Sequence, residues 1–397
     1  MDNPFDYTKR QLTEIFGDVK AMFRDSLEEV IQPYVLQGLK VLLEDAMKAE
    51  IVGYTKADRY QRVKGRADYL NGYRYRNLGT AFGLLRRLAV PRTVRRNYQP
   101  GLFVRYARRT ALVNRFIREI FITGVSTRNV GVVLRALVGH GVSASAVSTV
   151  NKDLDQQVRA FQRRVLKDDY VYLFLDGVRQ RVVSCGKAVK KLVLVAYGIR
   201  FDGHREVIDF RVAKGESEAE WFAFLNSLYL RGLQERGLRL IITDGGKGLL
   251  AALDMVYPGL KRQRCWVHKL RNVANYVPRR YQVVCLGEAK GIYAADNYKE
   301  AVRRFQSWCR KWHALIPKAV ACLERDIEDL LVFFQEDKKL WIKLRTTNAI
   351  ERLFKELRRR TRPMSLFANV ASCERITYAL FTKYNNKWKD RRYVLFN

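Results

Sequence analysis

The chain has 397 residues, a length that suits two or three domains with their own hydrophobic cores. Apolar residues make up 48% of the sequence and charged residues 29%, which is typical of globular and not of disordered proteins. The formal net charge is +34, from 74 Lys and Arg against 40 Asp and Glu. Because this charge is spread along the chain, we expect a polyanionic partner, and nucleic acid is favoured over an anionic membrane.

Membrane insertion and secretion are both disfavoured by the sequence. The longest stretch without a charged residue, 136–151, has 16 residues and is too short to span a bilayer. The N-terminal MDNPFDYTKR lacks the apolar segment of a secretory signal. The six cysteines are too sparse for a disulfide framework and fit a reducing compartment. We therefore expect a cytoplasmic protein with no membrane partner.

Residues 1–50 are predicted to form two amphipathic helices that are separated near Pro33. Apolar residues recur at helical spacing from Leu12 to Ile31. The segment is locally acidic, which disfavours contact with DNA. A role in dimerisation fits this pattern, and a helix that only caps a neighbouring domain fits it equally well.

Residues 51–111 interleave arginines with tyrosines, and a small β-element is predicted near 73–90. Arginine beside aromatic rings suits phosphate contact combined with base or sugar stacking. The alternative is a half-buried sheet whose basic face is only solvated. The DNA contacts predicted here are Arg74, Arg76, Arg92 and Arg95.

Residues 112–167 have the pattern of three helices joined by short turns. Ser126 is a candidate N-cap for the second helix, which ends at the glycines 139 and 141. This arrangement resembles a helix-turn-helix, with 145–152 as the candidate recognition helix. Many small bundles share the pattern, so a purely structural role remains open. The DNA contacts predicted here are Arg128, Ser145, Ser148 and Lys152.

The pattern changes to strands at residue 168. Strands are predicted over 170–175, 192–199, 207–212, 238–243 and 262–265, with helices over 216–230 and 247–255. Three consecutive strands followed by alternating helices and strands indicate a mixed sheet with helices packed on it. Residues 272–341 are helical throughout, and a last helix is predicted to start near Thr347. The fold class expected is therefore an α/β multidomain protein.

Three carboxylates occur where this architecture would bring them together. Asp176 is predicted to end the first strand, Asp244 ends a later strand, and Glu351 lies in the first turn of the final helix. Acidic side chains at the C-terminal ends of neighbouring strands face a common crevice. Such a cluster repels itself unless cations neutralise it, and its hard oxygen donors suit Mg²⁺, with Mn²⁺ as the other candidate. Each Asp alone is equally consistent with an ordinary strand-to-turn aspartate.

Several stretches resemble the Mutator-type transposases of bacterial insertion sequences. The resemblance covers roughly 45–395, and the stretches that carry it are LRLIITDGGKGLLAALDMVYPGLKRQRCWVHKLRNVANYVPRR, TTNAIERLFKELRRRTRP, GVSTRNVGVVLRALVGHGVSASAVSTVNKDLDQQV and NGYRYRNLGTAFGLLRRLAVPR. The family has a ribonuclease-H-like core with an Asp-Asp-Glu triad and an all-helical insertion before the Glu. The resemblance therefore implies that Asp176, Asp244 and Glu351 are metal-binding catalytic residues.

This resemblance also orders the domains and implies a function. The ribonuclease-H-like core would occupy 168–271, the helical insertion 272–341, and the final helix with its basic tail 342–397. The implied function is a DDE transposase in the bacterial cytoplasm, at the nucleoid. It would bind terminal inverted repeats as a homodimer, cleave double-stranded DNA and join 3′-OH ends to target DNA by two-metal phosphoryl transfer.

Cys265 and His268 match the Cys-x-x-His motif that such transposases carry after the second Asp. The favoured interpretation places His268 at the rim of the active site, where it donates to a phosphate or orients a neighbour. A structural histidine is an alternative, and so is a zinc site completed by Cys309 and His313, because the spacing suits zinc ligands.

Basic residues around these motifs are predicted to contact DNA phosphates. They are Arg264, Lys269, Arg271, Arg358, Arg359 and Arg362. A solvated basic helix face is the alternative for the residues around His268. The tryptophans of the helical region, Trp308, Trp312 and Trp341, are expected in its core, with a DNA wedge as the alternative.

Two other functions remain compatible with the sequence. One is a metal-dependent DNA nuclease or resolvase that does not transfer strands. The other is a DNA-binding repressor built on the helix-turn-helix, which the presence of all three carboxylates disfavours.

Overall fold

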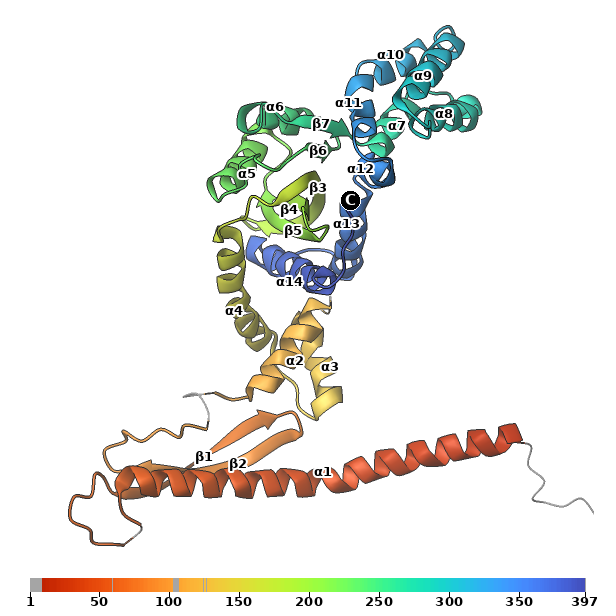
Figure 1. Cartoon of the computed structure of the whole chain (residues 1–397). Helices are drawn as coiled ribbons and strands as arrows, with labels where there is room; N and C mark the ends of the chain where they lie inside the picture. The colour runs from red at the N-terminus through yellow and green to blue at the C-terminus, as the bar shows by residue number, and fades with distance from the viewer. Residues whose placement is uncertain (1–8, 59, 103–106, 124, 126, 397) are drawn as a thin grey trace, which may run out of the picture. The chain divides into compact units, whose positions relative to one another are not determined.

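The computed structural model describes residues 9–58, 60–102, 107–123, 125 and 127–396, and the side chains of 9–30, 127, 128 and 363 are also outside the description. The chain divides into two units, Met1–Val150 and Asn151–Asn397, and each is described by itself (Figure 1). Among the described helices, none has an apolar stretch of the length that a bilayer requires.

The first unit begins with one long helix, α1 (Lys9–Thr55), and not with the two helices predicted. Pro33 lies inside α1, so the predicted break near Pro33 is wrong. A proline removes only one helical hydrogen bond, and the turns after it are held by packing. Leu36, Leu39 and Leu43 pack against a core cluster that contains Met47 of the same helix.

A β-hairpin supplies the surface against which α1 packs. It consists of β1 (Leu70–Thr80) and β2 (Gly83–Thr93), which pair antiparallel, and it confirms the predicted β-element. Leu78, Leu85, Leu88 and Val90 of the hairpin form the core cluster with α1. Glu44 of α1 also accepts a hydrogen bond from the Ala89 amide of β2, at 2.8 Å. This half of α1 therefore caps the hairpin, and part of its acidic character has a structural role.

Three helices follow the hairpin, as predicted. They are α2 (Ala111–Ile122), α3 (Thr127–Val138) and α4 (Ala144–Arg163), and α4 runs across the boundary between the two units. The Ser143 hydroxyl accepts a hydrogen bond from the Ala146 amide at 3.2 Å and so caps the start of α4. Gly131 of α3 lies against the turn that precedes α4. A Cβ at this position would lie 2.2 Å from the Val142 carbonyl oxygen, so glycine is required there.

The second unit is built on a five-stranded mixed sheet in the order β5-β4-β3-β6-β7. The strands are β3 (Tyr170–Ser184), β4 (Lys187–Arg200), β5 (Arg205–Ala213), β6 (Leu240–Thr243) and β7 (Lys261–Arg264). β3, β4 and β5 pair antiparallel, whereas β6 and β7 are parallel to β3. The predicted mixed sheet is confirmed.

Helices cover both faces of this sheet (Figure 1). On one face, α5 (Glu218–Leu230) and α6 (Lys247–Val256) pack on a cluster that includes Leu173 and Leu175 of β3. Phe174 points to the other face, since side chains alternate along a strand. There it contacts Tyr197, which in turn contacts Trp388 of α14 (Val370–Trp388).

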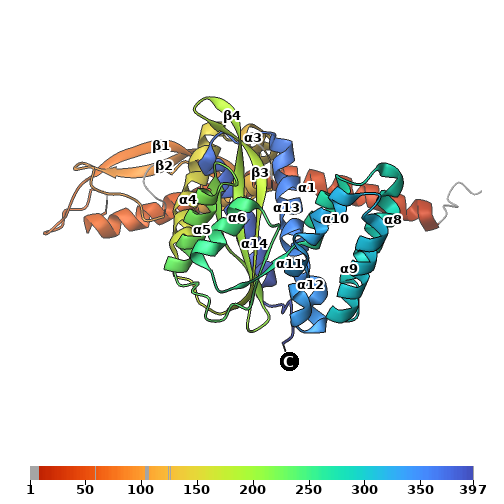
Figure 2. The ribbon, with the colours of Figure 1, turned by 90° about the horizontal axis from the view of Figure 1, so that it is seen from above.

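Residues 266–344 are helical, which confirms the prediction for 272–341. The helices are α7 (Trp266–Ala274), α8 (Arg279–Tyr293), α9 (Tyr298–Trp312), α10 (Pro317–Glu324), α11 (Ile327–Leu331) and α12 (Trp341–Leu344), with short 3₁₀ turns before α12. Figure 2 shows α8, α9 and α10 standing away from the sheet, beyond α13 (Asn348–Thr361). Two helices follow this region, α13 and α14, where one was predicted.

Two of the three tryptophans expected in the core of the helical region are buried there. Trp308 is buried and donates a hydrogen bond to the Cys285 carbonyl, at 3.0 Å, and Trp312 is buried and donates to Glu288, at 2.8 Å. Trp341 packs on Phe334, with ring centroids 4.6 Å apart. The predicted core role is confirmed for Trp308 and Trp312, whereas Trp341 is half-buried.

Candidate functional site

The parallel pairing of β3 with β6 places two carboxylates side by side. The pairing ends where Leu175 faces Thr243, so the next residues, Asp176 and Asp244, occupy equivalent positions on neighbouring strands. Asp176 does not end its strand as predicted: β3 continues to Ser184, because β4 pairs with it over its full length. The two aspartates therefore lie where β6 ends, while β3 continues past them.

Glu351 approaches these two carboxylates from α13. It lies in the first turn of this helix, as predicted, and its amide donates to the Thr347 carbonyl at 3.0 Å. Glu351 Oε1 is 3.4 Å from His268 Nε2 and 3.5 Å from Arg271 Nη1. The charges of Asp176 and Asp244 also raise the pKa of His268, so both carboxylates lie near the imidazole that Glu351 contacts.

Asp176 dominates the electrostatics of the site. Its side chain is buried, and the residue is only 6% exposed. Burial raises the pKa of Asp176 to about 7, and the charges of Asp244 and Glu351 add to the increase. His268 and the Gly177 amide act in the opposite direction but do not outweigh burial. A cation that enters the site would favour the ionised form of the Asp176 carboxyl group.

The donor set fits a hard divalent cation. Three carboxylates offer only oxygen ligands, which Mg²⁺ and Mn²⁺ prefer. Across the described residues, no group of three or more His, Cys, Asp or Glu side chains is placed so that it could hold a metal ion. Asp176, Asp244 and Glu351 therefore suit such a cation in ligand type and in charge, but as placed here they do not form a metal site.

Cys265 and His268 hold the start of α13 in place through Thr347. The Thr347 amide donates to Cys265 Sγ at 3.3 Å, and the Thr347 hydroxyl lies 3.4 Å from both Cys265 Sγ and His268 Nδ1. A hydrogen bond with Cys265 and the nearby carboxylates raise the pKa of His268 to about 9, against the effect of burial. The imidazolium form of His268 is therefore favoured, and its ring faces Glu351. Its partners in the described structure are Cys265, Thr347 and Glu351, whereas Cys309 and His313 belong to α9 and its C-cap.

Arg264 shapes the turn that follows Asp244. Its guanidinium donates to the Gly245 carbonyl at 3.0 Å and pairs with Asp326 at 2.7 Å. Gly245 has a φ of +80°, and a Cβ there would lie 2.1 Å from Arg264, so only glycine fits. The Gly246 amide donates to Asp244 Oδ1 at 3.0 Å, which orients this carboxylate.

Lys269 is an internal ion-pair partner and not a surface cation. It is only 2% exposed, and its ammonium group pairs with Asp326. The prediction that Lys269 contacts DNA is wrong in this structure, because α7 turns this side chain toward α11. Arg264 is likewise engaged with Asp326, whereas Arg271 remains exposed beside Glu351. Asp326 was missed from the sequence, since a lone acid in a helical region carries no distinctive pattern.

A basic cavity of about 670 Å³ lies in the first unit, between β1 and the turn that precedes α4. It is lined by Arg74, Arg76, Arg108, Arg109, His140 and Ser143, among others, and its described lining contains no carboxylate. Burial lowers the pKa of Arg76, and the neighbouring Arg74 lowers it further. The same two effects, with Arg108 as the neighbour, lower the pKa of Arg109. Arg108 and Arg109 were not predicted as site residues, although their adjacent positions in a basic segment are a signal.

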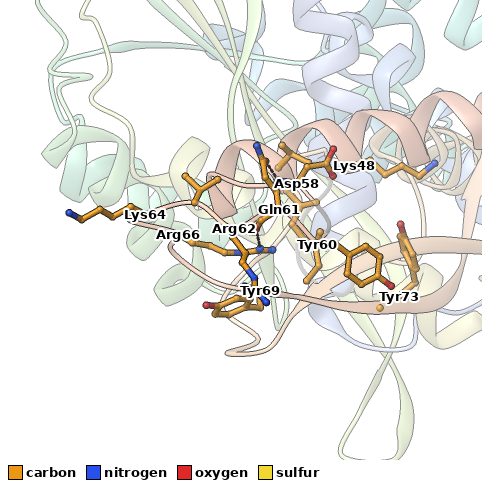
Figure 3. A pocket seen from close by; sticks show the side chains of 14 residues that line it. Lys48, Asp58, Tyr60, Gln61, Arg62, Lys64, Arg66, Tyr69 and Tyr73 are labelled. Atoms are coloured by element: carbon orange, nitrogen blue, oxygen red, sulfur yellow. Dashed lines mark hydrogen bonds between the residues drawn. The ribbon is translucent and has the colours of Figure 1, made fainter.

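A second cavity of the first unit, of about 760 Å³, combines cations with tyrosine rings. Figure 3 shows Arg62, Lys64, Tyr60 and Tyr69 around it, between the end of α1 and the start of β1. Arg66 stacks on Tyr69 at 4.6 Å and donates to two loop carbonyls, which fixes the wall of the cavity. This is the interleaving of arginine and tyrosine on which the predicted DNA contact rests.

The remaining predicted DNA contacts lie on the surface of their elements. Arg92 and Arg95 are exposed at the end of β2, Ser145 and Lys152 are exposed on α4, and Ser148 is half-buried there. Arg358, Arg359 and Arg362 are exposed at the end of α13. Arg128 belongs to α3, and its side chain lies outside the described residues.

Comparison with known proteins finds relatives of one kind along nearly the whole chain. The family described as "Transposase, Mutator family" matches residues 11–391. The chain is 34% identical to the transposase for insertion sequence element ISRM5 of Rhizobium meliloti, over 93% of this chain and 90% of the relative. It is 35% identical to the transposase for IS406 of Burkholderia multivorans, over 91% and 93%. It is 33% identical to the transposase for IS256 in transposon Tn4001 of Staphylococcus aureus, over 90% and 92%.

Removing Asp326 is expected to destabilise the second unit strongly. Asp326→Ala leaves the buried Lys269 ammonium without a partner, which typically lowers the free energy of unfolding by about 3–5 kcal/mol. Urea denaturation followed by tryptophan fluorescence measures this loss. Glu328→Ala, an exposed carboxylate two residues away, serves as the control and should change stability by less than about 0.5 kcal/mol. Equal effects of the two substitutions would show that the internal ion pair has no special weight.

Proposed function

Because the chain belongs to the Mutator family of transposases, we propose that it cleaves DNA at transposon ends and joins the freed 3′-OH to target DNA by metal-dependent phosphoryl transfer. The observation that carries this proposal is the approach of Asp176, Asp244 and Glu351 to one imidazole, from two strands and a helix far apart in the sequence. The protein is thus a DNA transposase, and these residues are the proposed DDE triad.

We assign the second unit to the ribonuclease-H-like fold. Support comes from the order of its sheet, in which an antiparallel β5-β4-β3 group continues into parallel β6 and β7. The first proposed ligand lies on β3, the second directly after β6, and the third on α13, after the helices 266–344. This is the order that the family's catalytic core requires.

The chain's own residues have distinct parts in the proposed reaction. A bound Mg²⁺ or Mn²⁺ would supply charge neutralisation at the attacking and leaving oxygens. Asp176, Asp244 and Glu351 would hold it, and the first two are fixed by their strands. His268 faces Glu351 and its imidazolium form is favoured, so this form can donate to a phosphate oxygen next to that carboxylate. Arg271, exposed at the same edge, would hold a further phosphate.

We propose that the first unit binds the terminal inverted repeats. Two of its cavities are lined with cations, and the cavity at Arg74 and Arg76 has no carboxylate in its described lining. On α4, which begins in the first unit and continues into the second, Ser145, Ser148 and Lys152 share one face, since they are three, four and seven positions apart. This face would contact base edges, whereas the arginines would contact the phosphate backbone.

Neutralising the proposed triad is expected to abolish chemistry and spare binding. Asp176→Asn, Asp244→Asn and Glu351→Gln keep side-chain shape and remove charge. Removing a residue that hydrogen-bonds to a metal ligand typically lowers metal affinity or activity by about 10–100-fold. Removing a ligand itself should therefore lower cleavage and joining by more than about 100-fold. The measurement is strand cleavage and strand transfer with Mg²⁺ and a duplex carrying the element's ends.

Glu328→Gln is the matched control for this series, because Glu328 is an exposed carboxylate outside the site. A variant of the triad that keeps cleavage near the wild-type level would remove its residue from the proposed ligands. Cleavage by the wild type without any joining would favour the nuclease or resolvase alternative.

Contacts between the first unit and the phosphate backbone of DNA are expected to dominate the salt dependence of DNA binding. Each phosphate contact contributes about 0.9 to the slope of log K against log salt concentration. Arg74→Gln should therefore lower the slope by about one contact in a fluorescence anisotropy titration. A slope that Arg74→Gln leaves unchanged would contradict the assignment of this cavity to DNA.

We further propose a homodimer that forms through α1. Ile31, Tyr34, Val35 and Leu42 form an apolar stripe on the side of α1 that does not pack on the hairpin, with Tyr34 76% and Leu42 69% exposed. Leu42→Glu should convert the dimer to a monomer in light scattering, because it buries a charge in the proposed interface. Gln37→Glu, which adds the same charge on another side of α1, should leave the mass at that of a dimer. A dimer that survives Leu42→Glu would exclude this stripe as the interface.

A further inference from the structure

A cavity of about 580 Å³ lies beside α13, outside the carboxylate site. We call it the α13 pocket; its walls come from the start of β5, from α12, α13 and α14, and from the C-terminal tail. Glu351 does not line it, but Arg352 does, and consecutive residues of a helix project about 100° apart. The proposed catalytic face and the α13 pocket therefore occupy adjacent faces of the same two helical turns.

Two cations are held inside the α13 pocket by aromatic groups. The Arg205 guanidinium lies 4.5 Å from the centroid of the Trp388 ring and 4.2 Å from that of Tyr393. The Lys343 ammonium lies 4.7 Å from the Tyr393 ring and donates to the Tyr393 carbonyl at 2.5 Å. Burial lowers the pKa of Lys343, and the charge of Arg205 lowers it further. The two cations are thus close enough to repel each other.

The charge of the α13 pocket is not balanced from within. Among the residues that the structure describes in its lining, the carboxylate is Glu356, which accepts from Arg360 at 2.7 Å and is therefore engaged. Arg205, Lys343, Arg352 and Lys355 have no ion pair with a carboxylate in the described structure. Like charges gathered in a cavity disfavour each other unless an anion joins them. Salt screens the exposed cations, and an anionic ligand would add a fixed counter-charge.

A track of cations leads out of the α13 pocket along α13. Arg352, Lys355 and Arg359 lie three, four and seven positions apart, so they share one face of the helix and are exposed. At 1.5 Å per residue this track is about 10 Å long. A small anion would fill only the pocket, whereas a polymer of phosphates would occupy the pocket and the track together.

We propose that the α13 pocket and its track bind the phosphodiester backbone of a DNA strand, next to the bond that is cleaved at Glu351. This inference rests on the proposed function, because it adds a second DNA contact to the same helix. Arg205 suits the role, since ring stacking orders its guanidinium before a phosphate arrives. The contact is independent of sequence, because no base edge is needed for it.

The test compares salt dependence of DNA binding between pocket variants and the wild type. The probe is a fluorescein-labelled duplex of arbitrary sequence, titrated with the full-length protein at several salt concentrations. Arg352→Gln and Lys355→Gln should each lower the slope of log K against log salt by about 0.9. Lys318→Gln removes an exposed cation of α10, away from the α13 pocket, and should leave the slope unchanged.

The substitutions are chosen so that misfolding does not decide the outcome. Arg352 and Lys355 are exposed on α13, so their substitution should not disturb the fold. Lys343→Met removes the hydrogen bond to the Tyr393 carbonyl, so its salt dependence is interpreted only if the variant melts at the wild-type temperature. Slopes equal to that of the wild type in Arg352→Gln and Lys355→Gln would overturn the proposal. If Arg74→Gln lowers the slope in the same assay, the proposed function stands without the α13 pocket. If the wild type binds no duplex, both fail.

Discussion

The position of Glu351 depends on three contacts of one threonine. Thr347 is the residue before α13, and its amide and hydroxyl bind Cys265 and His268 at the start of α7. Since α7 follows β7 directly, these contacts tie the first turn of α13 to the sheet that carries Asp176 and Asp244. The Cys-x-x-His spacing acts here through helix geometry, which turns Cys265 and His268 toward the same neighbour. These contacts help to position the third carboxylate relative to the other two.

A second set of contacts attaches the helical region 266–344 to the sheet. Asp326, at the start of α11, binds both Arg264 at the end of β7 and Lys269 in α7. Arg264 in turn holds the turn at Gly245, so the same carboxylate also supports the backbone next to Asp244. Burying three charges together is tolerated because each has an opposite partner within hydrogen-bonding distance. The helical region is thus coupled to the proposed metal site by electrostatics and not only by chain connection.

Much of the fold was predictable because its signals are local. The buried run at 170–175, the helical stripes of 112–158 and the glycine stops follow from periodicity and turn chemistry, and each corresponds to an element of the structure. The mistakes concern tertiary context. Pro33 lies inside α1 because packing on the hairpin holds the turns after it, and β3 extends past Asp176 because β4 pairs with it to Ser184. Lys269 looked like a surface cation because nothing in its neighbourhood reveals an acid 57 residues later.

The net charge of +34 has a structural consequence once the paired cations are set aside. Cations such as Arg264, Lys269 and Arg360 have carboxylate partners and work inside the fold. The described linings of the cavity at Arg74 and of the α13 pocket instead hold several cations and one carboxylate, Glu356, which pairs with Arg360. Such groups repel one another in the unbound protein, and a phosphate backbone relieves that repulsion while releasing its own counterions. If DNA binds at these two cavities as proposed, relief of the repulsion and release of counterions would both favour it at the same residues.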